Sequence, residues 1–327
     1  MQKDKTFITT LPDLIEIQKT SFCWFIKQGL YQEFERISSI LDFTNNLEVW
    51  VFGNEYKLKM PNFNAVESKT QEITYSAQIY MPIEIRNKEQ GTISNKQKIL
   101  IGLLPLMTES ATFIINGCER VLISQIIRSP GIYFTKKKKF NATLIADQGS
   151  WLNFDFGSNP GTLISNIMIT INTSNKITAI QLLNSMGLNN VKIQQTIQQT
   201  DDFLSNSFEL DNPKSFVLAN SIFSQIFDPL YYNIGRVGRI KLNQKLKLNI
   251  SENIETLTYE DILGVLDYLI EIDNKKGLAD DIDHLQNRRI RSIGELLKNQ
   301  YRIGFKRMSK LIKEHLTLGD SFKLKPT

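Results

Sequence analysis

The residues with the clearest capacity for chemistry lie between Asp280 and Arg291, where three aspartates stand close in sequence to three arginines. Aspartates at this spacing suit metal binding or acid–base work. The neighbouring arginines favour internal ion pairs that fix a loop. A third interpretation is base recognition, because arginine offers two parallel donors to a guanine edge and aspartate accepts from amino and imino groups. All three interpretations remain open from the residue types alone. The charged residues are Asp280, Asp281, Asp283, Arg288, Arg289 and Arg291.

Other segments have side chains suited to nucleic acid. Arg128 precedes Ser129-Pro130-Gly131, in which proline restricts the residue before it and glycine permits a positive φ. Arg128 at that stiff turn is either ordinary surface or a phosphate or base contact. Trp151 is either a core residue or a platform for an unpaired base. The run Lys136–Lys139 is either a solvated loop or a contact to a nucleic-acid backbone.

Composition excludes several kinds of site. Two cysteines, Cys23 and Cys118, cannot build a disulfide framework or a zinc site. With only His284 and His315, a Ser/His/Asp triad or a histidine-rich metal site is nearly excluded. The net charge of +5 permits a nucleic-acid partner without requiring one. No apolar run approaches the roughly 20 residues that span a bilayer, so no membrane partner is expected.

Length and periodicity predict two domains of mixed composition, because 327 residues exceed one comfortable core. Alternating or short apolar runs predict strands between residues 49 and 134, including Val121–Gln125, and again in Trp151–Phe156 and Ile164–Ile171. Helical spacing predicts helices over Leu11–Phe25, Leu257–Ile272 and the residues after Ser292. Helices are also predicted at Ile177–Met186, Val191–Gln199 and Ser215–Phe227. The predicted class is α+β.

Two of these helices carry further signals. Thr258 and Asp261 have capping-box spacing, and the apolar face after them predicts a buried helix. In the last helix the predicted buried stripe is Leu296, Leu297, Ile303, Met308, Leu311 and Ile312. The glycines of Gly235-Arg236-Val237-Gly238 resemble part of a dinucleotide motif, but no parallel βαβ context follows and that function is discounted.

Two distant segments together resemble one family. Ala111–Phe134 contains TFIING, ER, SQ and RSPG, and Asp280–Arg302 contains DDIDHL, NRR, RS and GE. Both resemble blocks of the β subunit of multisubunit DNA-dependent RNA polymerase, in the order of that family. LPDLIEIQ at the front and PLMT before TFIING are most similar to the cyanobacterial and plastid branch. The resemblance covers most of the chain.

The resemblance implies a β-rich protrusion domain interrupted by a mixed α/β lobe domain. The implied boundaries are residues 1–120 for the first part of the protrusion, 121–285 for the lobe and 286–327 for the return of the protrusion. In such β subunits these modules form one wall of the DNA cleft and hold downstream and non-template DNA. The protein is then expected to be an N-terminal β fragment.

Site residues are carried over from the family motifs. In the family a pocket holds one unpaired non-template base, and Asp283 and Arg288 match the residues that read guanine there. Ile282 matches a residue lining the pocket, Arg128 one beside it, and Trp151 one that stacks a neighbouring base. A separate match, at the edge of the site where rifamycins bind in relatives, covers Ile123, Ser124 and Gln125. Gln286 replaces the glycine of the family motif, a change expected to stiffen the loop.

The resemblance also implies partners. No catalytic residue, metal or cofactor is expected in this chain, because the aspartates that hold Mg²⁺ lie in β′. Expected partners are a C-terminal β polypeptide, the β′ and α subunits, a sigma factor and DNA. An end at Thr327 fits a recombinant fragment or a naturally split gene. Asn, Ile and Lys are frequent, which suggests an AT-rich coding genome and favours a split plastid gene. A bacterial cytoplasm is the alternative location. Rival functions are a free-standing nucleic-acid-binding or polymerase-regulating module, and a metal enzyme built on Asp280, Asp281 and Asp283.

Overall fold

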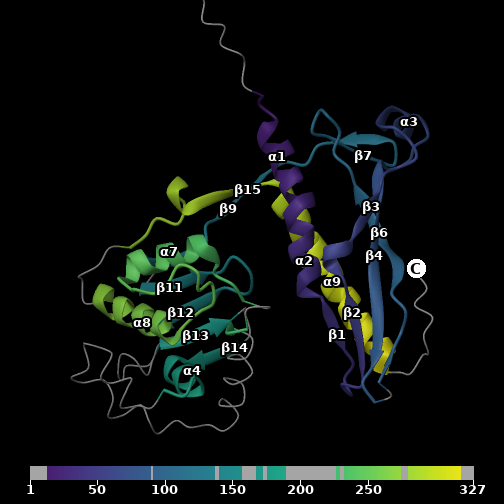
Figure 1. The fold of residues 1–327 in the computed structure, drawn as a ribbon. Helices are drawn as coiled ribbons and strands as arrows, with labels where there is room; N and C mark the ends of the chain where they lie inside the picture. The colour runs from purple at the N-terminus through teal and green to yellow at the C-terminus, as the bar shows by residue number, and fades with distance from the viewer. Residues whose placement is uncertain are drawn as a thin grey trace, which may run out of the picture. The chain divides into compact units, whose positions relative to one another are not determined.

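The structure is a computed structural model that describes residues 13–89, 91–136, 140–156, 167–171, 175–188, 226–228, 232–273 and 279–317. It divides into two compact units (Figure 1): unit 1 is Met1–Gln125 with Ile290–Thr327, and unit 2 is Ile126–Arg289. The chain leaves unit 1 through β9 (Gln125–Arg128) and returns through β15 (Arg288–Arg291), and these two strands pair. Helices combined with antiparallel sheets confirm the α+β class. The boundaries between the units lie after Gln125 and Arg289, whereas the predicted boundaries lie after residues 120 and 285. The identity of the units as protrusion and lobe stays a prediction.

Unit 1 is built on a sheet in which the long strand β4 pairs with four neighbours, in the order β1-β2-β4-β3 with β5 and β6 also on β4. A separate hairpin, β7–β8, follows. The predicted strand at Val121–Gln125 is wrong, because pairing begins only at Gln125. The strands are β1 Ser39–Leu41, β2 Leu47–Val51, β3 Lys57–Lys59, β4 Ser76–Asn87, β5 Thr92–Ile93, β6 Gln97–Pro105, β7 Phe113–Ile115 and β8 Cys118–Arg120.

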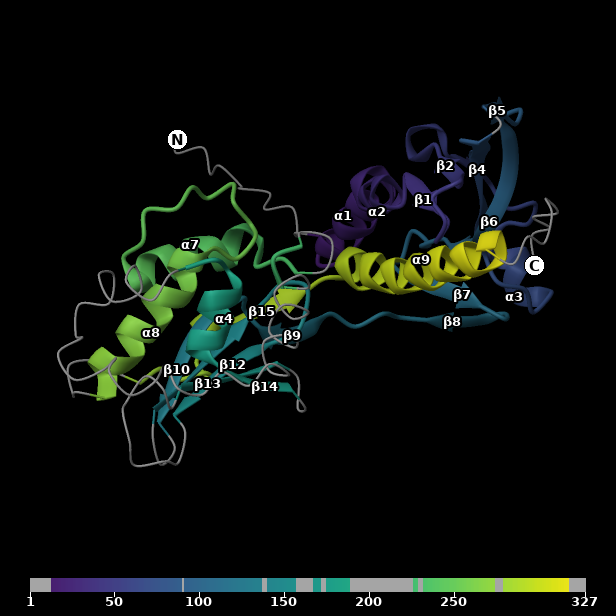
Figure 2. The ribbon, with the colours of Figure 1, turned by 90° about the horizontal axis from the view of Figure 1, so that it is seen from below.

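The helices of unit 1 share one core with this sheet. The helix predicted over Leu11–Phe25 is found as α1 (Glu16–Trp24). Helical structure then continues beyond the prediction through a π-helical turn (Phe25–Gly29) and α2 (Leu30–Arg36), and α3 (Ala65–Thr70) is short. Figure 2 shows α9 (Ile293–Thr317) as the long yellow helix of this unit. Its buried stripe advances by three or four residues, whereas the predicted members Ile303 and Leu311 are exposed. The stripe is Ile293, Leu297, Tyr301, Phe305, Met308 and Ile312.

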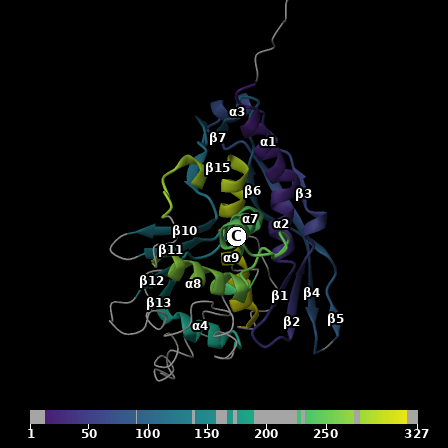
Figure 3. The same cartoon turned by 90° about the vertical axis from the view of Figure 1, so that its left-hand side faces the viewer.

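Unit 2 contains a five-stranded antiparallel sheet in sequential order, β10-β11-β12-β13-β14. Alternate side chains of these strands, such as Phe134, Leu144 and Phe154, form one core with the helices. Figure 3 shows α4 and α8 beside this sheet. The predicted helix at 191–199, and the predicted helix at 215–227 except its last two residues, lie outside the described residues. The elements are β10 Gly131–Lys136, β11 Phe140–Ile145, β12 Leu152–Phe156, β13 Ile167–Ile171, β14 Asn175–Thr178, α4 Ala179–Ser185, α7 Gly235–Leu246 and α8 Tyr259–Asp273.

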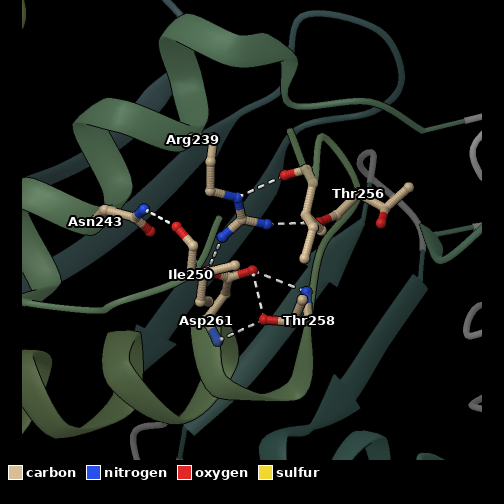
Figure 4. A network of polar contacts seen from close by, with 7 residues as sticks. Arg239, Asn243, Ile250, Thr256, Thr258 and Asp261 are labelled. Atoms are coloured by element: carbon tan, nitrogen blue, oxygen red, sulfur yellow. Dashed lines mark hydrogen bonds and ion pairs between the residues drawn. The ribbon is translucent and has the colours of Figure 1, made fainter. Parts of the chain in front are cut away.

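The predicted capping box of α8 is confirmed. Thr258 N donates to Asp261 Oδ2 at 2.8 Å, and Asp261 N donates to Thr258 Oγ1 at 3.4 Å. Asp261 has a second partner, Arg239 of α7, whose side chain is fully buried (Figure 4). The Arg239 guanidinium donates to Asp261 Oδ1 at 2.5 Å, to Ile254 O at 2.8 Å and to Thr256 O at 2.5 Å. This network fastens α7 to α8 and to the segment that precedes α8.

Candidate nucleic-acid interface

The predicted base-reading residues Asp283 and Arg288 are brought together by a short loop that ends in a 3₁₀ turn (Leu285–Asn287). Arg288 Nη2 donates to Asp283 Oδ1 at 2.6 Å, and the two side chains remain 39% and 74% exposed. Asp281 Oδ1 accepts from Asp283 N at 2.9 Å, and its carbonyl accepts from Asn287 Nδ2 at 2.7 Å. The loop is therefore shaped from within, while its carboxylate and guanidinium stay open to solvent.

Arg128 and Trp151 form a second exposed pair in the same unit. The Arg128 guanidinium carbon lies 5.7 Å from the centre of the Trp151 ring, within cation–π range. Trp151 is 44% exposed, so it is not a core residue. A ring that is 44% exposed offers aromatic surface to a base.

The two pairs are connected through the backbone of the turn and the loop. Ser129 N, next to Arg128, donates to Asn287 O, next to Arg288, at 2.9 Å. The buried Tyr133 hydroxyl donates to Ser129 O at 2.7 Å, and burial raises the pKa of this phenol, which stays protonated as a donor. The turn and the loop are thus held side by side, at the point where β9 and β15 pair.

Two further charged residues of the cluster, Asp280 and Arg289, have partners of their own. Asp280 pairs with Lys245 of α7 and also accepts from Phe134 N at 2.7 Å. Arg289 Nη2 pairs with Asp147 Oδ1 at 2.8 Å. In the described part of the chain, no group of three or more acidic, histidine or cysteine side chains is placed to hold a metal ion. This pattern of separate ion pairs favours the loop-fixing interpretation for Asp280, whereas Asp281, Asp283 and Arg288 are exposed.

Other predicted residues are placed as follows. Ile282 is partly buried beside Asp283. Ile123 is 80% exposed and, with Ser124, precedes β9, which begins at Gln125. Cys23 and Cys118 are free and exposed.

None of the helices in the described ranges has both the length and the apolar character needed to cross a bilayer. Sequence reasoning missed Lys241 and Lys245, which contact the loop from α7, and Arg239, which fixes α7 itself. Only the helical spacing of the two lysines, i and i+4, pointed to a shared face.

Comparison with known proteins shows what the chain is similar to. A family model described as RNA polymerase Rpb2, domain 2, matches residues 219–291, which include Asp283 and Arg288. The whole chain is 40% identical to the DNA-directed RNA polymerase subunit beta of Rhodomonas salina, of which it covers 31%. It is 41% identical over 97% of its length to the subunit beta of Thermosynechococcus vestitus, covering 30% of that protein, and 40% identical to that of Synechocystis sp.. The chain is therefore similar over almost its whole length to DNA-directed RNA polymerase β subunits, and it spans about a third of the length of the relatives that it matches.

Proposed function

We propose that this chain is the N-terminal part of a polymerase β subunit that forms one wall of the DNA cleft and reads an unpaired non-template base. The observation that carries the proposal is the exposed Asp283–Arg288 pair beside the Arg128–Trp151 pair. The first pair supplies a carboxylate that accepts hydrogen bonds and a guanidinium that donates them. The second supplies a cation and an aromatic surface, which suit a phosphate and a stacked base.

Guanine is the base that fits these groups. An extruded guanine presents donors on its Watson–Crick edge and acceptors at O6 and N7. The Asp283 carboxylate accepts from the donors, and the Arg288 guanidinium donates to the acceptors. Adenine, cytosine and thymine also carry donors and acceptors, but none combines two adjacent donors on the Watson–Crick edge with an O6/N7 acceptor pair, so each fits the two charged side chains less completely.

The proposal is tested with short single-stranded DNA that carries one guanine in a thymine run, compared with the same strand carrying adenine. Fluorescence anisotropy at fixed salt measures both dissociation constants for the 327-residue chain. We expect a guanine preference that Asp283→Ala removes, at a cost of about 1–3 kcal/mol in discrimination. The matched control is Glu252→Ala, since Glu252 is another exposed carboxylate of unit 2 paired with an arginine, Arg236.

Equal affinity of the unaltered chain for guanine and adenine strands would refute base reading. Loss of preference in Glu252→Ala as well would show that net charge, not the Asp283 carboxylate, sets it. Either result leaves the similarity to β subunits untouched, because that rests on the comparisons.

The wider assembly follows from the same proposal. The chain would act with a polypeptide supplying the rest of β, with β′ and α subunits and with a sigma factor, in a plastid or a bacterial cytoplasm. The catalytic Mg²⁺ would belong to β′, and Ile123, Ser124 and Gln125 would border the rifamycin site. Affinity purification from the native source tests this: stoichiometric recovery of those subunits is expected, whereas recovery of the chain alone favours a free-standing module.

A further inference from the structure

The loop that carries Asp283 and Arg288 has an exposed middle and fixed ends. Asp283, His284 and Leu285 are exposed, so packing does little to hold the middle in place. Its ends, by contrast, contact buried or half-buried groups of β10 and α7. The arrangement of the two base-reading side chains therefore depends on the hydrogen bonds inside the loop and on what holds its ends.

Lys245 holds the first end. Its ammonium forms an ion pair with the Asp280 carboxylate, both side chains being about one-fifth exposed, and it also donates to Ile132 O at 3.3 Å. Asp280 N donates to Phe134 O, and Asp280 Oδ2 accepts from Phe134 N, each at 2.7 Å. The same ammonium lies 5.2 Å from the Phe134 ring centre. Asp280 is thereby attached to the edge of β10, and Lys245 neutralises its charge there.

Lys241 holds the second end. Its ammonium donates to Gln286 O at 3.3 Å, inside the 3₁₀ turn that precedes Arg288. Burial, and secondarily the charge of Lys245, lower the pKa of Lys241. Its stem passes over Gly131, where an added Cβ would lie 3.4 Å from Lys241 Cβ and Cδ. Since Gly131 has φ +144°, a conformation that side chains disfavour, this close approach of α7 to the Arg128 turn depends on glycine.

We propose that Lys241 and Lys245 are positioning residues for base recognition, which clamp the two ends of the loop so that Asp283 and Arg288 face one base together. This inference rests on the proposed function. The two lysines act through Asp280 and Gln286, and no contact of their own with DNA is required. Recognition needs such support, because a site loose by about 1 Å loses most of its selectivity.

The clamp has a structural readout that needs no DNA. Hydrogen exchange of the peptide covering residues 279–289 is compared in the unaltered chain, Lys245→Gln, Lys241→Gln and Arg236→Gln. Arg236 is the matched control, because it is a cation of the same helix whose partner is Glu252. We expect exchange in the loop to rise about fivefold or more in the two lysine variants and to stay unchanged in the control, since charge-assisted hydrogen bonds are lost only in the former. Unchanged loop exchange in both lysine variants would overturn the proposal.

Guanine preference supplies the functional readout. All three variants lose one positive charge and should lose similar affinity for any strand, but only Lys241→Gln and Lys245→Gln should lose preference for guanine, by about fivefold. Lys245→Arg, which keeps the ion pair, should restore most of it. If Asp283→Ala abolishes the preference while both lysine variants retain it, the clamp is wrong and base reading stands. If the unaltered chain has no preference, base reading fails, and the exchange result alone decides whether the clamp exists.

Discussion

Replacing Arg239 with methionine tests how strongly unit 2 depends on one buried ion pair. Arg239 and Asp261 are both 0% exposed, and the guanidinium makes three hydrogen bonds, two of them to backbone carbonyls. Removing one member of a buried pair costs about 3–5 kcal/mol, because the other charge is left without a partner in a low dielectric. Asp261 keeps its two hydrogen bonds from Thr258, which place the expected loss nearer the middle of that range. We expect Arg239→Met to lower the free energy of unfolding of unit 2 by about 4 kcal/mol.

The assay must separate the two units, so hydrogen exchange at increasing urea is followed in peptides of α7 and α8, with peptides of α9 as an internal reference. Arg236→Met is the matched control. Arg236 lies three residues earlier on the same helix, but its ion pair with Glu252 is 70% and 52% exposed, and its loss should cost under about 0.5 kcal/mol. The reference peptides of unit 1 should not change in either variant.

A double-mutant cycle adds a stricter test. Arg239→Met with Asp261→Asn removes both charges, so the double variant should lose about 2 kcal/mol less than the sum of the single losses. Additive losses, or a single loss below about 1 kcal/mol for Arg239→Met, would refute the view that this pair is a strongly coupled buried interaction.

Two further predictions concern unit 1. Glu33 is 2% exposed and accepts from Arg302 Nε at 2.9 Å and Nη2 at 2.5 Å, so Glu33→Gln should destabilise the α2–α9 packing by about 2 kcal/mol in urea unfolding, whereas Glu314→Gln, in an exposed pair with Lys310, should change little. The hydrogen bond from Lys69, with a second from Thr112, holds the pKa of Glu119 below its usual 4.5. A carboxylate with a lowered folded pKa stabilises the fold above its unfolded pKa and ceases to do so as pH falls through the folded value. Exchange in β7–β8 should therefore rise on acidification below about pH 4.5, and a Glu119→Gln variant that keeps the same pH dependence would contradict this assignment.

Local patterns predicted the local structure well where a helix both packs and caps itself. The α8 prediction is confirmed because the capping box and the apolar face at Ile262, Val265, Leu266 and Leu269 are encoded within one helix. The predicted buried stripe of α9 was partly wrong, since Tyr301 and Phe305 pack in the core of unit 1 while Leu311 remains exposed. Hydrophobicity alone does not say which of two neighbouring faces of a helix packs against the rest of its unit.

The candidate site was predictable only through the resemblance. Residue types near Asp283 left metal binding, ion pairing and base reading open, with ion pairing favoured by the neighbouring arginines. Long-range partners separate them. Asp280 meets Lys245 across 35 residues and Arg289 meets Asp147 across 142, and no periodicity in the sequence encodes such pairs.

Helix α7 has one face that is fixed in the core of unit 2 and another that contacts the exposed loop. Lys241 and Lys245 are four residues apart and share one face, whereas Arg239, two residues before Lys241, projects to roughly the opposite side. One face is fixed by the buried Arg239–Asp261 pair, and the other contacts the loop that carries Asp283 and Arg288. Lys241 and Lys245 can hold the loop only if α7 itself is held in place. The buried Arg239–Asp261 pair therefore contributes to the geometry of the exposed Asp283–Arg288 pair without contacting it. Under conditions where unit 2 stays folded, Arg239→Met should therefore loosen the loop along with α7, while Arg236→Met should loosen neither.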